Sequence, residues 1–208
     1  MSVAGFVAAE RAGIADDLAR LGPNAPTLCE GWTTRDLLAH LLLREHDLVA
    51  APGILLPGPF ASHLEKRMEE AVHDDYEASI ARFRAGSGTL FRFVPAANVN
   101  EYYVHHEDIR RANGEGPRTL SEEDQRALWK VLGAVALQAK LRVRGIGVVI
   151  DGEPHGRRVT RAIEPVVIVR GLPSELVLYF MGRRSVADVS IDGDPDAKAT
   201  LEAAALGF

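Results

Sequence analysis

The order of hydrophobic and polar positions divides the chain into a helical first part and a second part of short strands and helices. Up to about residue 145, apolar residues recur every three or four positions, the spacing that places them on one side of an α-helix. Capping residues, glycines and prolines mark where these segments begin and end. The pattern predicts a bundle of four or five helices, at residues 3–21, 34–50, about 61–85, 96–113 and 121–142.

Two of these helices begin with a specific capping signal. Thr33 and Asp36 form a variant of the capping box, with aspartate where Glu or Gln is usual, and Ser121 and Asp124 have the same spacing. Between two predicted helices, the segment "APGILLPGPF" (51–60) is rich in Pro and Gly but also strongly apolar. A loop of that composition normally covers another part of the protein.

After about residue 145 the pattern changes to short β-branched runs bounded by Gly, Pro and Asp, which indicates strands. The four runs are "IGVVID", "RRVTRAI", "PVVIVRG" and "VADVSIDGD", and two helical stretches accompany them, "PSELVLYFMGR" and "PDAKATLEAAAL". The expected fold class is therefore α+β. We expect a helical bundle over residues 1–145 and a small α/β C-terminal domain over residues 146–208.

Composition and charge restrict the compartment and the partners. Of the 208 residues, 47% are hydrophobic and 25% charged, values typical of a folded globular protein. The formal net charge of −5 is mild, so it does not favour nucleic acid or an anionic membrane as a partner. The single cysteine, Cys29, excludes an internal disulfide, and no apolar run is long enough to span a bilayer. These features predict a cytoplasmic protein.

Candidate chemistry is concentrated in the stretch "NEYYVHHEDIRRANGEG", residues 100–116. At about 100° per residue, Glu101, His105 and Asp108 lie on one stripe of the predicted helix, whereas His106 lies about 140° from Glu101. Because Glu101 and His105 are four residues apart, their side chains reach one point above the helix. Such a pair is either an exposed contact of small energetic value or two ligands of a metal site.

A metal site needs a third ligand from another segment, and His40 is the best candidate. It lies inside the apolar predicted helix 34–50, at the border of the leucine face. A lone histidine at such a position is more often a core residue with a hydrogen-bonded partner. The sequence pattern alone therefore leaves both interpretations open for His40, as it does for Glu101 and His105.

Two motif blocks decide between these interpretations. The stretch "CEGWTTRDLLAHLLLRE" contains Trp-x-x-x-Asp-Leu-x-x-His, and "EYYVHHEDIRRA" contains Glu-x-x-Val-His-x-x-Asp. Together they resemble the DinB-like metal-binding bundles, in particular the mycothiol-dependent maleylpyruvate isomerase family. The end of the chain is similar to that family's small C-terminal domain, which resembles sterol-carrier folds. The resemblance implies a DinB-like bundle followed by a sterol-carrier-like α/β module.

The resemblance also implies a site. It assigns His40, Glu101 and His105 as zinc ligands, a set that leaves one coordination position open, as in catalytic zinc sites; iron(II) also suits such a set. A thiol cofactor, mycothiol, would bind at that position, where a metal lowers the pKa of a thiol. In the family an arginine of the C-terminal domain contributes to the active site. Arg183 and Arg184 are the nearest matches, and either would hold a substrate carboxylate.

Other residues near the expected ligands have less specific roles. Asp108 would orient a metal ligand or form a salt bridge with Arg111 or Arg35. Trp32 would anchor the entrance of its helix, and Cys29 is interpreted as a small core residue whose closeness to the His40 helix merits a test.

Three functions follow as alternatives. The first is a metal-dependent enzyme of the mycothiol-dependent isomerase or S-transferase type, acting on a small substrate that can be anionic. The second is a hydrolase in which the same metal activates water. The third is a non-catalytic protein that binds a metal or a small apolar ligand. The resemblance favours the first alternative, and the residues themselves do not specify the substrate.

Overall fold

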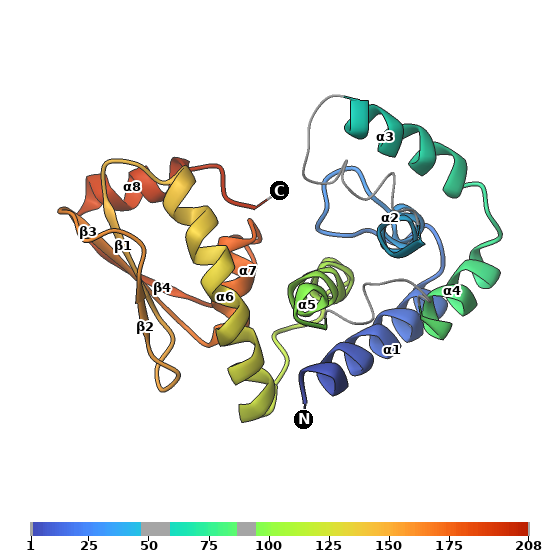
Figure 1. Ribbon diagram of the computed structural model, residues 1–208, viewed down its shortest axis with the longest axis horizontal. Helices are drawn as coiled ribbons and strands as arrows, with labels where there is room; N and C mark the ends of the chain where they lie inside the picture. The colour runs from blue at the N-terminus through green and yellow to red at the C-terminus, as the bar shows by residue number, and fades with distance from the viewer. Residues whose placement is uncertain (1, 47–58, 87–94, 208) are drawn as a thin grey trace. The chain divides into compact units, whose positions relative to one another are not determined.

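The structure is a computed structural model that describes residues 2–46, 59–86 and 95–207 (Figure 1). Within these ranges it contains eight helices and one four-stranded sheet, which confirms the α+β class. The contacts between residues divide it into two compact units, one from Ser2 to Gly116 and the other from Pro117 onward. Every described helix is too short or too polar to cross a membrane.

The first unit consists of five helices that follow the predicted pattern closely. They are α1 (Val3–Leu21), α2 (Thr34–His46), α3 (Pro59–Ala71), α4 (Tyr76–Ala85) and α5 (Pro95–Ala112). Helices α1, α2, α4 and α5 share one hydrophobic core, because their apolar residues recur at helical spacing and face one another. Its members are Ile14, Ala15, Leu18, Leu37, Leu38, Leu41, Leu42, Tyr76, Ile80, Phe83, Tyr102 and Ile109.

One detail of this unit differs from the sequence prediction, and two predicted segments lie wholly or partly outside the described residues. The single helix expected over about 61–85 is two helices, because the Asp75 side chain accepts a hydrogen bond from the Ala78 N–H and so starts α4 as its N-cap. Most of the apolar segment 51–60 lies outside the described residues, as does the end of the helix expected over 34–50. The capping contact is confirmed, since the Thr33 N–H donates to Asp36 Oδ2 at 2.8 Å.

Helix α5 is fastened to α1 by a buried histidine. His106 Nδ1 lies 2.8 Å from Glu10 Oε2, and His106 Nε2 lies 3.3 Å from Asp17 Oδ2. The ring packs directly against Gly13, where an added Cβ would lie 2.4 Å from His106 Cε1. The hydrogen bond with His106 is the main reason that the pKa of Asp17 falls to about 2. His106 therefore connects two helices and is turned away from the Glu101 stripe, as predicted.

The second unit is built around a sheet of strand order β2-β1-β3-β4. Strands β1 (Gly147–Asp151) and β3 (Val166–Arg170) are parallel neighbours, and β2 (Arg157–Val159) and β4 (Ser190–Gly193) flank them in antiparallel pairs. Helices α6 (Glu122–Arg142), α7 (Pro173–Phe180) and α8 (Pro195–Ala203) complete it, with α6 and α7 side by side (Figure 1). The four strands and the last two helices match the predicted runs.

The division between the units falls earlier than the expected boundary near residue 145. Helix α6 was expected to complete the N-terminal bundle, but it packs against α7 within the second unit. Ser174 donates its N–H to Gln125 Oε1 at 3.0 Å, and the Gln125 amide donates to Ser174 Oγ at 3.1 Å. Helical periodicity predicts that one face of α6 is buried, but it does not say which partner buries that face.

The contact between His106 and Gly13 predicts that a Gly-to-Ala substitution in this helix lowers the free energy of unfolding instead of raising it. Replacing Gly by Ala inside a helix normally stabilises it by about 1 kcal/mol. Gly13→Ala should instead destabilise the first unit by about 1–3 kcal/mol, because the new methyl group overlaps the buried imidazole. Urea denaturation followed by circular dichroism measures this. Gly133→Ala in α6, whose Cβ would meet only the end of the Arg158 side chain at 3.4 Å, should show no comparable loss.

The lowered pKa of Asp17 predicts a pH-dependent contribution to stability. A carboxyl group whose pKa is lower in the folded than in the unfolded protein stabilises the fold only while it is ionised. Asp17→Asn should therefore lower the free energy of unfolding at pH 7. The difference from the unsubstituted protein should shrink as the pH falls from about 4, the unfolded pKa, towards about 2. Urea denaturation at a series of pH values checks this, and a difference that stays constant down to pH 2 contradicts it.

Candidate metal centre

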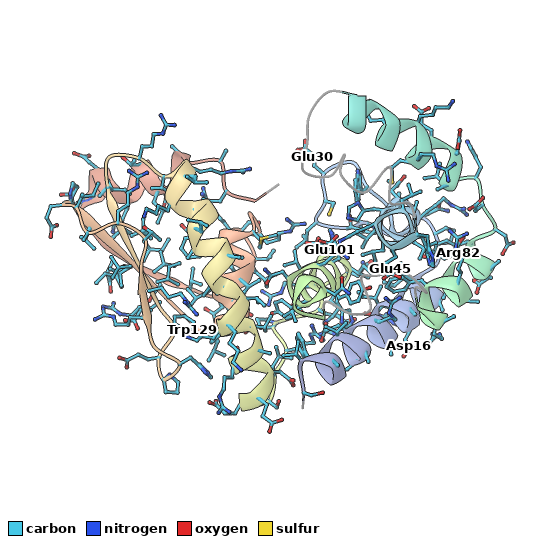
Figure 2. All side chains as sticks on the ribbon, viewed as in Figure 1. Asp16, Glu30, Glu45, Arg82, Glu101 and Trp129 are labelled. Atoms are coloured by element: carbon cyan, nitrogen blue, oxygen red, sulfur yellow. The ribbon has the colours of Figure 1, made fainter. Side chains whose placement is uncertain are left out.

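The three predicted ligands lie together in the first unit. His40 comes from α2, and Glu101 and His105 come from α5, where Figure 2 labels Glu101. His40 Nε2 lies 2.9 Å from Glu101 Oε1, and His105 Nε2 lies 3.4 Å from the same oxygen. One ligand atom from each of the three residues falls within 4.8 Å of the others. The two imidazole rings are close as well, with centroids 5.1 Å apart.

Local sequence explains how these side chains reach one point. Glu101 and His105 are separated by one helical turn of α5, so both side chains project in nearly the same direction. His40 is 7% exposed and lies on α2 among buried leucines, so its ring is enclosed by the helix interface. A buried imidazole needs a polar partner, and Glu101 is that partner. The sequence prediction of a shared position for the three residues agrees with this geometry.

The spacing of the ligand atoms fits a four-coordinate metal ion. Zinc–nitrogen and zinc–oxygen bonds of about 2.0–2.2 Å in a tetrahedron place neighbouring ligand atoms about 3.3–3.6 Å apart. The separation of 3.4 Å between His105 and Glu101 lies in this range, and the separation of 2.9 Å between His40 and Glu101 is shorter, at hydrogen-bond length. Two imidazole nitrogens and one carboxylate oxygen form the donor set of many catalytic zinc sites, and the same set suits iron(II). The residues therefore fit a divalent cation, although they do not select one element.

Burial and hydrogen bonding shift the pKa values of these groups in opposite directions. Burial lowers the pKa of His40, and its hydrogen bond with Glu101 offsets this only in part. Burial opposes ionisation of Glu101, but the hydrogen bonds with His105 and His40 prevail and hold the pKa of Glu101 well below its usual value. Burial also disfavours protonated His105, yet hydrogen bonds with Asp108, Cys29 and Glu101 raise the pKa of His105 well above its usual value. The hydrogen bonds therefore favour a negative charge on Glu101 and a positive charge on His105.

A buried arginine adjoins the Glu101 carboxylate. Arg44 lies one turn after His40 on α2, and its Nε is 3.4 Å from Glu101 Oε1. The same guanidinium donates from Nη1 to Asn98 Oδ1 at 2.7 Å. From the sequence alone, Arg44 was assigned no role. Its position one helical turn from His40 was the available signal, since such a residue shares the face that meets α5.

Asp108 lies on the other side of the His105 ring. Its Oδ2 is 2.9 Å from His105 Nδ1 and 3.2 Å from the sulfur of Cys29, which donates to it. Cys29 Sγ is also 3.9 Å from His105 Nδ1. Of the two roles expected for Asp108, this contact matches the one in which the carboxylate orients a metal ligand. The contact of Cys29 with Asp108 was not anticipated, because 79 residues separate the two along the chain.

The two arginines expected to bind a substrate carboxylate differ in their surroundings. Arg184 donates to the carbonyl oxygens of Leu201 and Glu202 in the last turn of α8 and of Ala204, the C-cap residue, and so caps the end of that helix. These carbonyls occupy much of its hydrogen-bonding capacity, which points to a structural role. Arg183 donates from Nη1 to the Met181 carbonyl at 2.7 Å.

Comparisons with known proteins give one family match and a structural likeness. Residues 7–98 match the family model described as the mycothiol maleylpyruvate isomerase N-terminal domain. That segment contains Trp32, Asp36 and His40 but ends before Glu101 and His105. No curated protein matches the sequence.

Two solved structures share the fold. One is described as the crystal structure of the mycothiol-dependent maleylpyruvate isomerase; it is 19% identical, with a TM-score of 0.62 over 92% of this chain and 93% of that chain. The other is a histidine-to-alanine mutant of that enzyme, 18% identical over the same shares with the same TM-score. At this level of identity the likeness concerns the fold. The N-terminal part of the chain is thus similar to the mycothiol maleylpyruvate isomerase N-terminal domain, and the chain shares the fold of that isomerase structure.

Proposed function

We propose that this protein is a thiol-dependent metalloenzyme of the isomerase or S-transferase type, with a divalent metal held by His40, Glu101 and His105. The observation that carries the proposal is the convergence of both histidine Nε2 atoms on one oxygen of Glu101. Three protein ligands leave a fourth position for an exogenous group, as catalytic zinc sites do. The family match supports a thiol, mycothiol, as that group. Zinc is the metal that the resemblance of the sequence motifs implies.

A bound divalent cation would lower the pKa of a thiol beside it, so that the thiol reacts as a thiolate at neutral pH. The protein's own residues prepare this chemistry. The lowered pKa of Glu101 favours its ionised form, which attracts a cation. Asp108 Oδ2 accepts a hydrogen bond from His105 Nδ1–H, an arrangement that directs the lone pair of Nε2 towards a metal. The surrounding helices bury His40 and restrict water around it.

Residues outside the metal centre would determine which small substrate such an enzyme binds. The resemblance implies an arginine of the C-terminal unit that binds a substrate carboxylate. Of the two candidates, Arg183 remains the better one, because Arg184 caps α8. The sterol-carrier likeness of that unit likewise stays a proposal that the sequence resemblance supports.

The hydrolase alternative uses the same residues, so it makes the same prediction for metal binding and a different one for thiols. A hydrolase would be inhibited by chelators and indifferent to mycothiol. The donor set fits both reactions equally. The family match is what favours the thiol-dependent reaction.

The first prediction for the site concerns the ligands. Replacing His40, Glu101 or His105 by Ala should reduce the bound metal from about one per chain to a small fraction, because only two ligands remain. Metal analysis of the purified proteins after dialysis measures this. His46→Ala is the matched control, since His46 is exposed on the same helix as His40. Full metal content in the His105→Ala variant would contradict the assignment. His106→Ala is less suitable as a control, because it removes the contacts with Glu10 and Asp17.

The second prediction for the site concerns the thiol. In the cobalt(II)-substituted protein, adding mycothiol should produce a new sulfur-to-cobalt charge-transfer band, because the thiol enters the open coordination position and loses its proton. The titration should use the Cys29→Ser variant, since Cys29 Sγ lies only 3.9 Å from His105 Nδ1 and is itself a sulfur donor. A cobalt-loaded protein whose spectrum stays unchanged at saturating mycothiol favours the hydrolase. An alcohol analogue that lacks the thiol should give no band.

A further inference from the structure

One short loop touches both histidine ligands of the candidate centre. The loop from Thr27 to Trp32 is closed by internal hydrogen bonds: Thr27 Oγ1 donates to the Trp32 carbonyl at 2.9 Å, and the Trp32 N–H donates to the Cys29 carbonyl at 3.0 Å. The Trp32 ring packs against His40, with centroids 5.2 Å apart. On the other side, the Cys29 thiol contacts the Asp108 carboxylate, which in turn contacts His105.

The loop is tied to α5 at Asp108 by main chain and side chain together. The Leu28 N–H donates to the Asp108 carbonyl at 3.2 Å. The Cys29 thiol donates to Asp108 Oδ2 at 3.2 Å, and this oxygen is also the one that faces His105 Nδ1. The Asp108 side chain is completely buried, and these contacts help to fix the orientation of its carboxylate.

The direction of the Asp108 carboxylate decides which nitrogen of His105 is available to a metal. The terminal torsion of an aspartate side chain is soft, so a single hydrogen bond holds the carboxylate plane weakly. A second donor on the same oxygen restricts that torsion and keeps the oxygen aimed at Nδ1. His105 must carry its proton on Nδ1 for Nε2 to act as a ligand, and a fixed acceptor at Nδ1 favours that tautomer.

We propose that Cys29 is a positioning residue: its thiol holds Asp108 in the orientation that keeps His105 Nε2 directed at His40 and Glu101. The inference rests on the proposed metal centre and adds to it a residue that does not touch the metal. Serine retains the donor in a smaller, more polar side chain, whereas valine fills the space without a donor.

If Cys29 served only to pack against the core, the opposite ranking of serine and valine would be expected. Cys29 lies against the hydrophobic core cluster of the first unit, where free cysteines generally act as small apolar residues. If packing alone matters, valine should serve better than serine. If the hydrogen bond to Asp108 matters, serine should serve better than valine. The two substitutions therefore give opposite rankings for the two roles.

The test measures zinc affinity by competition with a chelator in the full-length protein, together with the cobalt(II) absorption spectrum. We expect Cys29→Ser to bind zinc within about threefold of the unsubstituted protein, and Cys29→Val to bind it about tenfold or more weakly, the usual effect of losing a group that orients a ligand. The cobalt bands of the valine variant should shift, because the His105 ring is held less firmly. Thermal unfolding provides the folding control, and Cys29→Ala replaces the valine variant if the latter does not fold.

A double substitution makes the test specific to the Asp108 contact. Asp108→Asn should also weaken zinc binding, and Cys29→Val should add little to that loss, since both act on the same hydrogen bond. Additive losses, the reverse ranking of serine and valine, or three equal affinities would each overturn the inference while leaving the metal centre intact. A failure of the unsubstituted protein to bind zinc would overturn the metal centre and this inference together.

Discussion

The rotation of helix α5 about its axis is the constraint on which the rest of the first unit depends. At about 100° per residue, neighbouring side chains of the segment from Glu101 to His106 point towards different parts of the protein. Glu101 and His105 face the candidate centre, Tyr102 enters the core, and His106 reaches α1. A rotation of one residue would exchange these roles and remove the centre. The fit of His106 against Gly13 and its bonds to Glu10 and Asp17 hold the helix in the required rotation.

A second set of buried polar contacts holds α5 against α2 and α1. Arg11 pairs with Glu45 at 2.5 Å, and the Tyr102 hydroxyl donates to the same carboxylate. Burial and the adjacent Glu45 raise the pKa of Tyr102, so its hydroxyl remains a donor. Buried charges cost desolvation energy, and removing one partner of such a pair typically costs about 3–5 kcal/mol. Hydrogen bonds and ion pairs are directional, whereas apolar contacts are not. The contacts of Glu45 with Arg11 and Tyr102 therefore select one arrangement of the three helices.

The sequence predicted most of what depends on local periodicity. The stripe of Glu101, His105 and Asp108 follows from the helical repeat alone, and the strands after residue 145 follow from β-branched runs and turn residues. The motif resemblance was needed to join His40 to that stripe, because no local pattern links residues about sixty positions apart. The contact between Cys29 and Asp108 was missed for the same reason. The units divide before α6, which periodicity could not show because it indicates that a face is buried without showing its partner. The break before α4 was not predicted, because the role of Asp75 as an N-cap was not recognised inside an apolar pattern. The contacts of Arg184 with carbonyls at the end of α8 are long-range and have no local sequence signal.

The salt bridge between Arg44 and Glu101 has a consequence for the order in which the protein is assembled. A partly buried carboxylate beside two imidazoles would be an unbalanced charge in a newly synthesised chain, but here the Arg44 guanidinium lies 3.4 Å from it. The fold of the first unit therefore does not need a cation to balance Glu101. In the proposed metal centre, a cation would bind to helices that are already packed. Its binding and loss would then be events of the folded protein and not conditions for folding.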